Sequence, residues 1–216
     1  MESYDKQLYA VLSGDLVRSG KLKSDELSSA KDCLKKAVGQ LDKLPKDSDK
    51  LVKGTIDFYR GDGWQLLLTQ PKYAFRACLF IRSYLKADTK ADTRIAVGIG
   101  EVSLINEKSI SQSIGKAFEV SGLALDKLKG RKRMTLACPY FMEDRFDSLS
   151  SVLELSDAII QKWTQNQAEA ISWALRGCKG IEISSKMKLK DKDGGTKHLR
   201  AAGWYAFESV LDRIEK

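Results

Sequence analysis

The sequence predicts an α+β protein in which an antiparallel sheet covered by helices is followed by a region of helices alone. Strand-like and helix-like segments alternate from about residue 8 to residue 138, and the strand signals stop after about residue 147. Of the 216 residues, 43% are hydrophobic and 31% are charged, which is typical of a folded globular chain. We therefore expect a sheet-containing domain over 1–145 and a helical region over 146–216.

The first strand and the first helix follow from apolar patterning. An apolar run over 8–13 stops at Gly14 and Asp15, which predicts a buried strand that ends at a polar loop. A helix over 24–44 is indicated by Ser24, a capping residue, and by apolar residues that recur at steps of three and four.

The next elements depend on turn residues. Strand-like runs over 54–60 and 64–69 flank the Gly-Asp-Gly sequence at 61–63, which predicts a β-hairpin. Pro71 suits the start of a helix, and we expect that helix over 72–86.

Small residues alternate with apolar ones over 94–102, which predicts another buried strand. A helix over 111–127 and a candidate strand over 133–138 follow. A hairpin placed between two helical crossovers is typical of a ferredoxin-like sheet, with both crossover helices on one face.

Helical periodicity continues after the boundary, which we place near Arg145. Helices are expected over 147–163, 165–176, 181–187 and 196–214. No Pro- or Gly-rich linker separates the two regions, so the first of these helices is expected to connect them.

The composition excludes several classes of site. Cys33, Cys78, Cys138 and Cys178 are far apart and His198 is the single histidine, so neither a Cys/His zinc site nor a His-based catalytic triad is expected. Unpaired cysteines in the sequence suit a reducing cytoplasm. No apolar run approaches the ~20 residues that span a bilayer. A net charge of +8 favours an anionic partner.

Two aspartates are candidates for metal chemistry. In a ferredoxin-like sheet the first strand lies beside the hairpin, so Asp15 and Asp62 are expected to meet at one end of the sheet. Paired carboxylates suit Mg²⁺, which binds through one or two carboxylates together with substrate phosphates. An aspartate beside a glycine also commonly serves only to shape its turn, and this alternative stays open.

The first part of the chain resembles class III nucleotide cyclase domains. The resemblance covers about residues 7–128, and its hairpin also resembles that of the related GGDEF domains. It implies that Asp15, Asp62 and the backbone carbonyl of Leu16 bind Mg²⁺, and that the ligand is a nucleotide. The segments that carry it are 10–17, 58–63, 94–100 and 115–118.

Two departures from that pattern concern catalysis. Phe58 stands where the family has its purine-selecting lysine, and residues 115–125 contain neither the asparagine nor the arginine of the family's catalytic helix. Those side chains stabilise the charge that develops during phosphoryl transfer. The resemblance therefore implies a degenerate cyclase-like domain.

The helical region has the rhythm of a helix-turn-helix and carries a local positive charge. Residues 179–200 contain seven Lys or Arg and three Asp or Glu. Basic groups near a recognition helix suit contacts with DNA phosphates, although a solvated lysine-rich loop is the alternative. Gly194 and Gly195 are expected to loosen the turn. The candidate DNA-binding residues are Lys186, Lys188, Lys190, Lys192, Thr196, Lys197, His198 and Arg200.

Over nearly its whole length the chain resembles the SatD-like family of bacterial proteins, through segments 165–171, 180–184 and 198–204 as well as the cyclase-like half. We therefore expect a cytoplasmic DNA-binding regulator that senses a ligand. A homodimer is expected because both kinds of module act in pairs. The alternatives are a Mg²⁺-dependent nucleotide-processing enzyme and a protein-interaction module with a basic surface.

Overall fold

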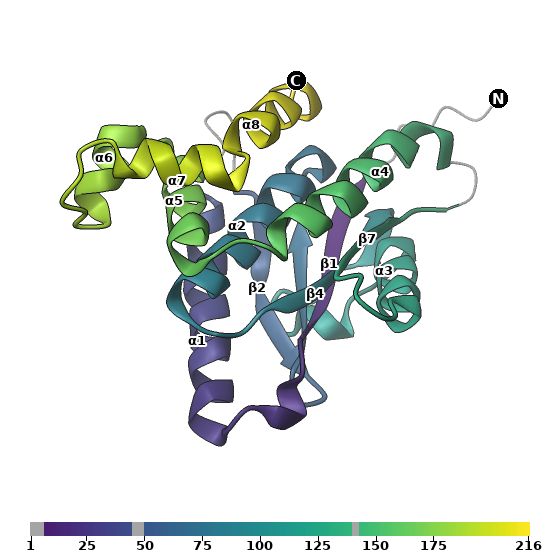
Figure 1. The fold of residues 1–216 in the computed structure, drawn as a ribbon. Helices are drawn as coiled ribbons and strands as arrows, with labels where there is room; N and C mark the ends of the chain where they lie inside the picture. The colour runs from purple at the N-terminus through teal and green to yellow at the C-terminus, as the bar shows by residue number, and fades with distance from the viewer. Residues whose placement is uncertain (1–6, 45–49, 140–142) are drawn as a thin grey trace.

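The computed structural model describes residues 7–44, 50–139 and 143–216, without the side chains of 143–145. Its centre is a mixed five-stranded sheet of order β2-β3-β1-β4-β7 (Figure 1). β1 runs antiparallel to β3 and to β4, β2 runs antiparallel to β3, and β7 is parallel to β4. The strands are β1 (Tyr9–Leu16), β2 (Val52–Tyr59), β3 (Gly63–Leu68), β4 (Thr93–Gly100) and β7 (Met134–Ala137).

Helices cover both faces of this sheet. The chain therefore combines a sheet with helices, which confirms the expected α+β class. Helices α1 (Ser24–Leu41) and α2 (Ala74–Asp88) lie on one face, and α3 (Lys116–Lys127) lies on the other (Figure 1). Short 3₁₀ turns, η1 (Ser19–Lys21) and η2 (Pro71–Tyr73), follow β1 and precede α2.

Helices alone make up the rest of the described chain. They are α4 (Glu143–Ile160), α5 (Gln165–Leu175), α6 (Gly180–Lys186), α7 (Gly194–Ala202) and α8 (Trp204–Ile214). α4 packs on β7, and α5 packs along α2, so the later helices form a further layer over the helical face (Figure 1). None of the helices in the described part of the chain has both the length and the apolar character of a membrane span.

Residues of β1 alternate between the two faces, as a strand requires. Ala10, Leu12 and Leu16 belong to the core beneath α1 and α2. On the other face, Val11 packs with residues of α3, and the hydroxyl of Ser13 lies 2.8 Å from that of Ser121 on α3. The odd-numbered positions of β1, Asp15 among them, therefore face α3.

One hydrophobic core runs through both regions of the chain. Its buried members include residues of the sheet, of α1 and α2, and of α4 to α8. The ring of Phe207 on α8 lies 6.4 Å from that of Phe75 and 5.5 Å from that of Trp163. Glu215, just beyond α8, forms a bidentate pair with Arg76 of α2, whose Nε donates at 2.7 Å. The expected boundary near residue 145 is thus crossed by continuous packing.

Two expected elements differ in the structure. The start of the expected helix over 111–127 is instead a 3₁₀ turn, η3 (Ile110–Gln112), and a short strand, β6 (Ile114–Gly115). β6 pairs with β5 (Val102–Leu104), so η3 lies in the segment that joins these two strands. The expected helix over 196–214 is divided into α7 and α8 at Gly203, whose φ of 78° places it in the left-handed region that ends helices.

Candidate functional site

The carboxylate of Asp15 lies at the end of β1, on the face covered by α3, and is 19% exposed. Arg94 of β4 stands directly opposite it in the antiparallel ladder. Nε of Arg94 donates to Oδ1 of Asp15 at 2.7 Å, and Nη2 donates to Oδ2. Nη1 of the same side chain donates to the carbonyl of Leu128 at 2.8 Å, just beyond α3. One guanidinium therefore occupies both oxygens of Asp15.

Asp62 comes to the same end of the sheet. It lies in the β2–β3 turn, next to Gly63, which is the β3 residue paired with Asp15. The hydrogen bond with Asp15 raises the pKa of Arg94, burial lowers it, and the charges of Asp15, Asp62 and Asp126 raise it further. Asp15 thus pairs directly with Arg94, and the carboxylates of Asp62 and Asp126 lie near enough for their charges to act on it.

Tyr59, at the end of β2, is affected by the charges of the same three aspartates. Burial raises the pKa of its phenol, the neighbouring Arg60 lowers it, and the charges of Asp15, Asp126 and Asp62 raise it further. The site is therefore an acidic end of the sheet in which Arg94 supplies the compensating positive charge.

Mg²⁺ would compete with this ion pair. Carboxylate and backbone oxygens are suitable Mg²⁺ ligands, but both oxygens of Asp15 already accept bonds from Arg94. Leu16, whose carbonyl is the third predicted ligand, is buried opposite Thr93. No cluster of three or more potential metal-ligating side chains occurs among the described residues. The arrangement does not fit a bound metal unless Arg94 moves away.

Sequence reasoning missed Arg94 and Asp126 as members of this site. The signal for Arg94 was present, because it is the one charged residue in a strand otherwise made of small and apolar residues, Thr93–Gly100. Asp126 had no comparable signal, since it reaches the site through the packing of α3 across β1 and β4.

The second candidate site lies on α6 and α7, which pack closely through glycines. A Cβ on Gly195 would lie 2.3 Å from the carbonyl oxygen of Gly180 and 2.8 Å from the amide nitrogen of Ser184. The hydroxyl of Ser184 accepts from the amide of Gly195 at 2.7 Å and donates to the carbonyl of Lys192 at 2.7 Å. The expectation that the two glycines loosen the turn is therefore wrong: Gly194 and Gly195 begin α7 and hold it against α6.

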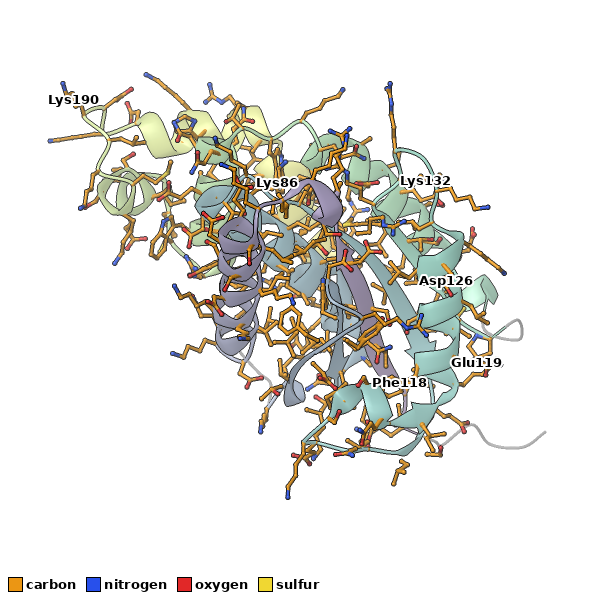
Figure 2. The ribbon with its side chains drawn as sticks, turned by 90° about the horizontal axis from the view of Figure 1, so that it is seen from below. Lys86, Phe118, Glu119, Asp126, Lys132 and Lys190 are labelled. Atoms are coloured by element: carbon orange, nitrogen blue, oxygen red, sulfur yellow. The ribbon has the colours of Figure 1, made fainter. Side chains whose placement is uncertain are left out.

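The predicted basic residues surround this turn. Lys197 pairs with Asp191 at 2.6 Å, and Nζ of Lys186 lies 5.4 Å from the ring centre of Trp173. Thr196 and His198 are half-buried, with Thr196 lying against Gly180. The others are exposed, and Figure 2 shows Lys190 at the outer tip of the segment between α6 and α7. Of the predicted basic side chains, only that of Lys197 forms an ion pair with the described residues, and the others are Lys186, Lys188, Lys190, Lys192, His198 and Arg200.

Comparison with models of known protein families and with curated proteins gave no match to this chain.

Proposed function

We propose that this chain is a DNA-binding regulatory protein of the bacterial cytoplasm, with a cyclase-like first domain that no longer performs the cyclase reaction. The single observation that carries the proposal is the basic turn, residues 186–200, displayed on a rigid frame. α6 and α7 are held together by glycine contacts and by Ser184, while the lysines between them extend into solvent.

The geometry of the turn supports binding to a phosphate backbone. Lysines on a firmly held turn lose less freedom on contact with a polyanion than lysines on a loose loop, and each phosphate contact releases condensed counterions. In this proposal α5, α6 and α7 are a helix-turn-helix with α7 as the recognition helix. The resemblance to the SatD-like family supports the same assignment.

The cyclase-like part of the proposal is supported by the sheet order. The succession β2-β3-β1-β4 with antiparallel neighbours suits a ferredoxin-like sheet, to which β7 adds one parallel strand. Loss of the cyclase reaction is supported by Arg94, which holds the carboxylate that a catalytic metal would need, and by Phe58 in place of a purine-selecting lysine.

DNA binding is tested by fluorescence anisotropy with a random-sequence duplex over a range of salt concentrations. We expect the logarithm of the binding constant to fall by about 0.9 per phosphate contact for each unit in the logarithm of salt. A combined Lys188→Gln, Lys190→Gln and Lys192→Gln variant is expected to bind more weakly and to lower this slope by about 1 for each lysine that contacts a phosphate.

The control is Lys108→Gln, compared with Lys190→Gln alone, because it also removes one exposed lysine, on the segment between β5 and η3. It should leave both affinity and salt slope unchanged. Absence of binding at low salt, or binding that does not depend on salt, would contradict the proposal and favour a protein-interaction surface. A monomer in sedimentation at micromolar concentration would contradict the proposed homodimer.

The placement of Asp15 and Asp62 at one end of the sheet favours a second candidate function, a Mg²⁺-dependent nucleotide-processing enzyme in which Arg94 leaves Asp15 when metal and nucleotide arrive. The test is incubation with each nucleoside triphosphate and Mg²⁺. Metal-dependent formation of a cyclic or oligomeric product, lost in Asp62→Ala, would replace the first proposal with this one.

A further inference from the structure

A pocket of about 340 Å³ lies between the sheet region and the later helices. Its walls come from the residues after β1, from the end of α2 and the segment leading to β4, from the residue before β7, and from the α4–α5 junction. None of its lining residues belongs to the Asp15–Arg94 site or to the basic turn. The side chains that set its character are Arg18, Lys86, Lys90, Asp92, Arg133 and Trp163.

Asp92 is the acidic residue among those that line the pocket, and its charge is already compensated. Nε and Nη2 of Arg82 donate to its two oxygens at 2.9 and 2.7 Å, and Arg133 donates to Oδ2 as well. The backbone amide of Thr93 adds a bond of 2.9 Å. Burial alone would raise the pKa of Asp92, but Arg82, together with Lys86 and Arg133, outweighs burial and holds that pKa below its ordinary value.

Asp157 of α4 is the second acid of this network, and it also accepts hydrogen bonds from Arg82 and Arg133. Its Oδ1 accepts from Nη1 of Arg82 at 2.8 Å, and its Oδ2 accepts from the backbone amide of Arg133 at 2.7 Å. Each oxygen of Asp92 therefore accepts two hydrogen bonds, and each oxygen of Asp157 accepts one. The buried guanidinium of Arg82 and the guanidinium of Arg133 together balance these two acids.

Lys86 forms an ion pair with Asp92 that has no hydrogen bond in it. Its side chain is 15% exposed, and its Nζ lies 3.9 Å from Oδ2 of Asp92, too far for a hydrogen bond. Burial lowers the pKa of Lys86, the charge of Asp92 partly reverses this effect, and Arg82 and Arg133 lower it further. Asp92 compensates this half-buried ammonium only in part, because it also balances two guanidinium groups, so a further anion beside Lys86 would be favourable.

Two further cations, Arg18 and Lys90, are exposed at the rim. Arg18 has a φ of 58°, a backbone conformation that is uncommon for residues other than glycine. The pocket and its network thus contain five cations and two acids, an excess of three positive charges. The cations are Arg18, Arg82, Lys86, Lys90 and Arg133, and the acids are Asp92 and Asp157. A phosphate monoester, with a charge near −2, matches such a site better than a carboxylate does.

We infer that this pocket binds a small phosphomonoester, with its phosphate among Lys86, Arg133, Lys90 and Arg18. A volume of about 340 Å³ is at the lower end of the range for small-molecule sites, so it fits a sugar phosphate or the phosphate and sugar of a mononucleotide. The pocket is partly open to solvent and is lined by elements distant in the sequence, which suits a small ligand bound at one place. The inference goes beyond the proposed function and does not depend on DNA binding.

Isothermal titration calorimetry of the full chain tests the inference with four probes: inorganic phosphate, ribose 5-phosphate, adenosine 5′-monophosphate and adenosine. We expect the two phosphate esters to bind, phosphate to bind more weakly, and adenosine not to bind. Lys86→Met removes the recessed charge and should weaken binding of the esters by about tenfold or more. Lys90→Met, at the exposed rim, should weaken it by about threefold. Lys108→Met, whose lysine lies outside the pocket, should change nothing.

Three results would overturn the inference. The first is equal binding of adenosine and its monophosphate. The second is unchanged affinity in Lys86→Met or, if that variant does not fold, in a combined Arg18→Gln and Lys90→Met variant. The third is loss of ester binding when duplex DNA saturates the protein, which would make the pocket a contact for the DNA backbone. Measuring DNA affinity on the same variants separates failure of this inference from failure of the proposed function.

Discussion

Replacement of Arg82 by methionine is expected to destabilise the protein strongly. The side chain of Arg82 is fully buried on α2 and donates three hydrogen bonds, to both oxygens of Asp92 and to Asp157. Removing one partner of a buried ion pair costs about 3–5 kcal/mol, because the remaining charge keeps its desolvation penalty. Arg133 still donates to both acids in the variant. We therefore expect a loss of about 4 kcal/mol in the free energy of unfolding.

Urea denaturation followed by circular dichroism measures this loss. At an m-value of about 2–3 kcal/mol/M, the midpoint should fall by about 1–2 M. In the wild type, the depressed pKa of Asp92 contributes stability above the ordinary pKa of an aspartate, and this stability is lost as the pH falls through the folded value. In Arg82→Met the carboxylate can instead take up a proton, so the difference between the two proteins should shrink from pH 7 to pH 4.5.

The control for this reasoning neutralises the acids along with the arginine. Combining Arg82→Met with Asp92→Asn and Asp157→Asn removes the uncompensated charges and should recover more than half of the loss. A loss below about 1 kcal/mol in the single variant, or a loss that grows at pH 4.5, would refute the view that charge compensation by Arg82 stabilises this junction.

Two further predictions concern packing and thiol chemistry. Gly195→Ala should lower the free energy of unfolding by about 1–3 kcal/mol in thermal denaturation, because its Cβ would meet the carbonyl oxygen of Gly180 at 2.3 Å. Gly39→Ala, on α1 with open space around the added Cβ, should raise the free energy of unfolding by about 0.5–1 kcal/mol. Changes of the same sign in the two variants would contradict the prediction. Burial raises the pKa of Cys33 and of Cys78 to about 12, so at pH 8.5 both should react with iodoacetamide more slowly than the half-buried cysteines. Mass spectrometry of the labelled protein would show the reverse order if the burial argument were wrong.

Local patterns in the sequence predicted most elements of the fold. The hairpin around residues 61–63 was predicted because Gly-Asp-Gly between two strand-like runs has few other conformations, and the structure confirms it with β2 and β3. The division of the last helix at Gly203 was missed because a single glycine within a helical pattern does not by itself indicate a left-handed residue.

The candidate sites could be predicted only in part. The positions of Asp15 and Asp62 at one end of the sheet followed from the expected topology. The pairing of Asp15 with Arg94 did not, because it depends on the register between β1 and β4, which no local pattern specifies. The cationic pocket was also beyond sequence reasoning, since Arg18, Lys86 and Arg133 come from three separate segments.

The continuous core described above has a consequence for how such a chain can change over evolutionary time. Helix α5 covers the outer side of α2, and Ile171 and Leu199 belong to the same core as Phe75 and Leu12. Removal of the later helices would leave a broad apolar surface on α2 facing water. These helices therefore cannot be exchanged between proteins as a self-contained cassette. Any change in the surface chemistry of residues 186–200 has to arise by substitution on the exposed side of the existing helices, while their buried side remains matched to α2.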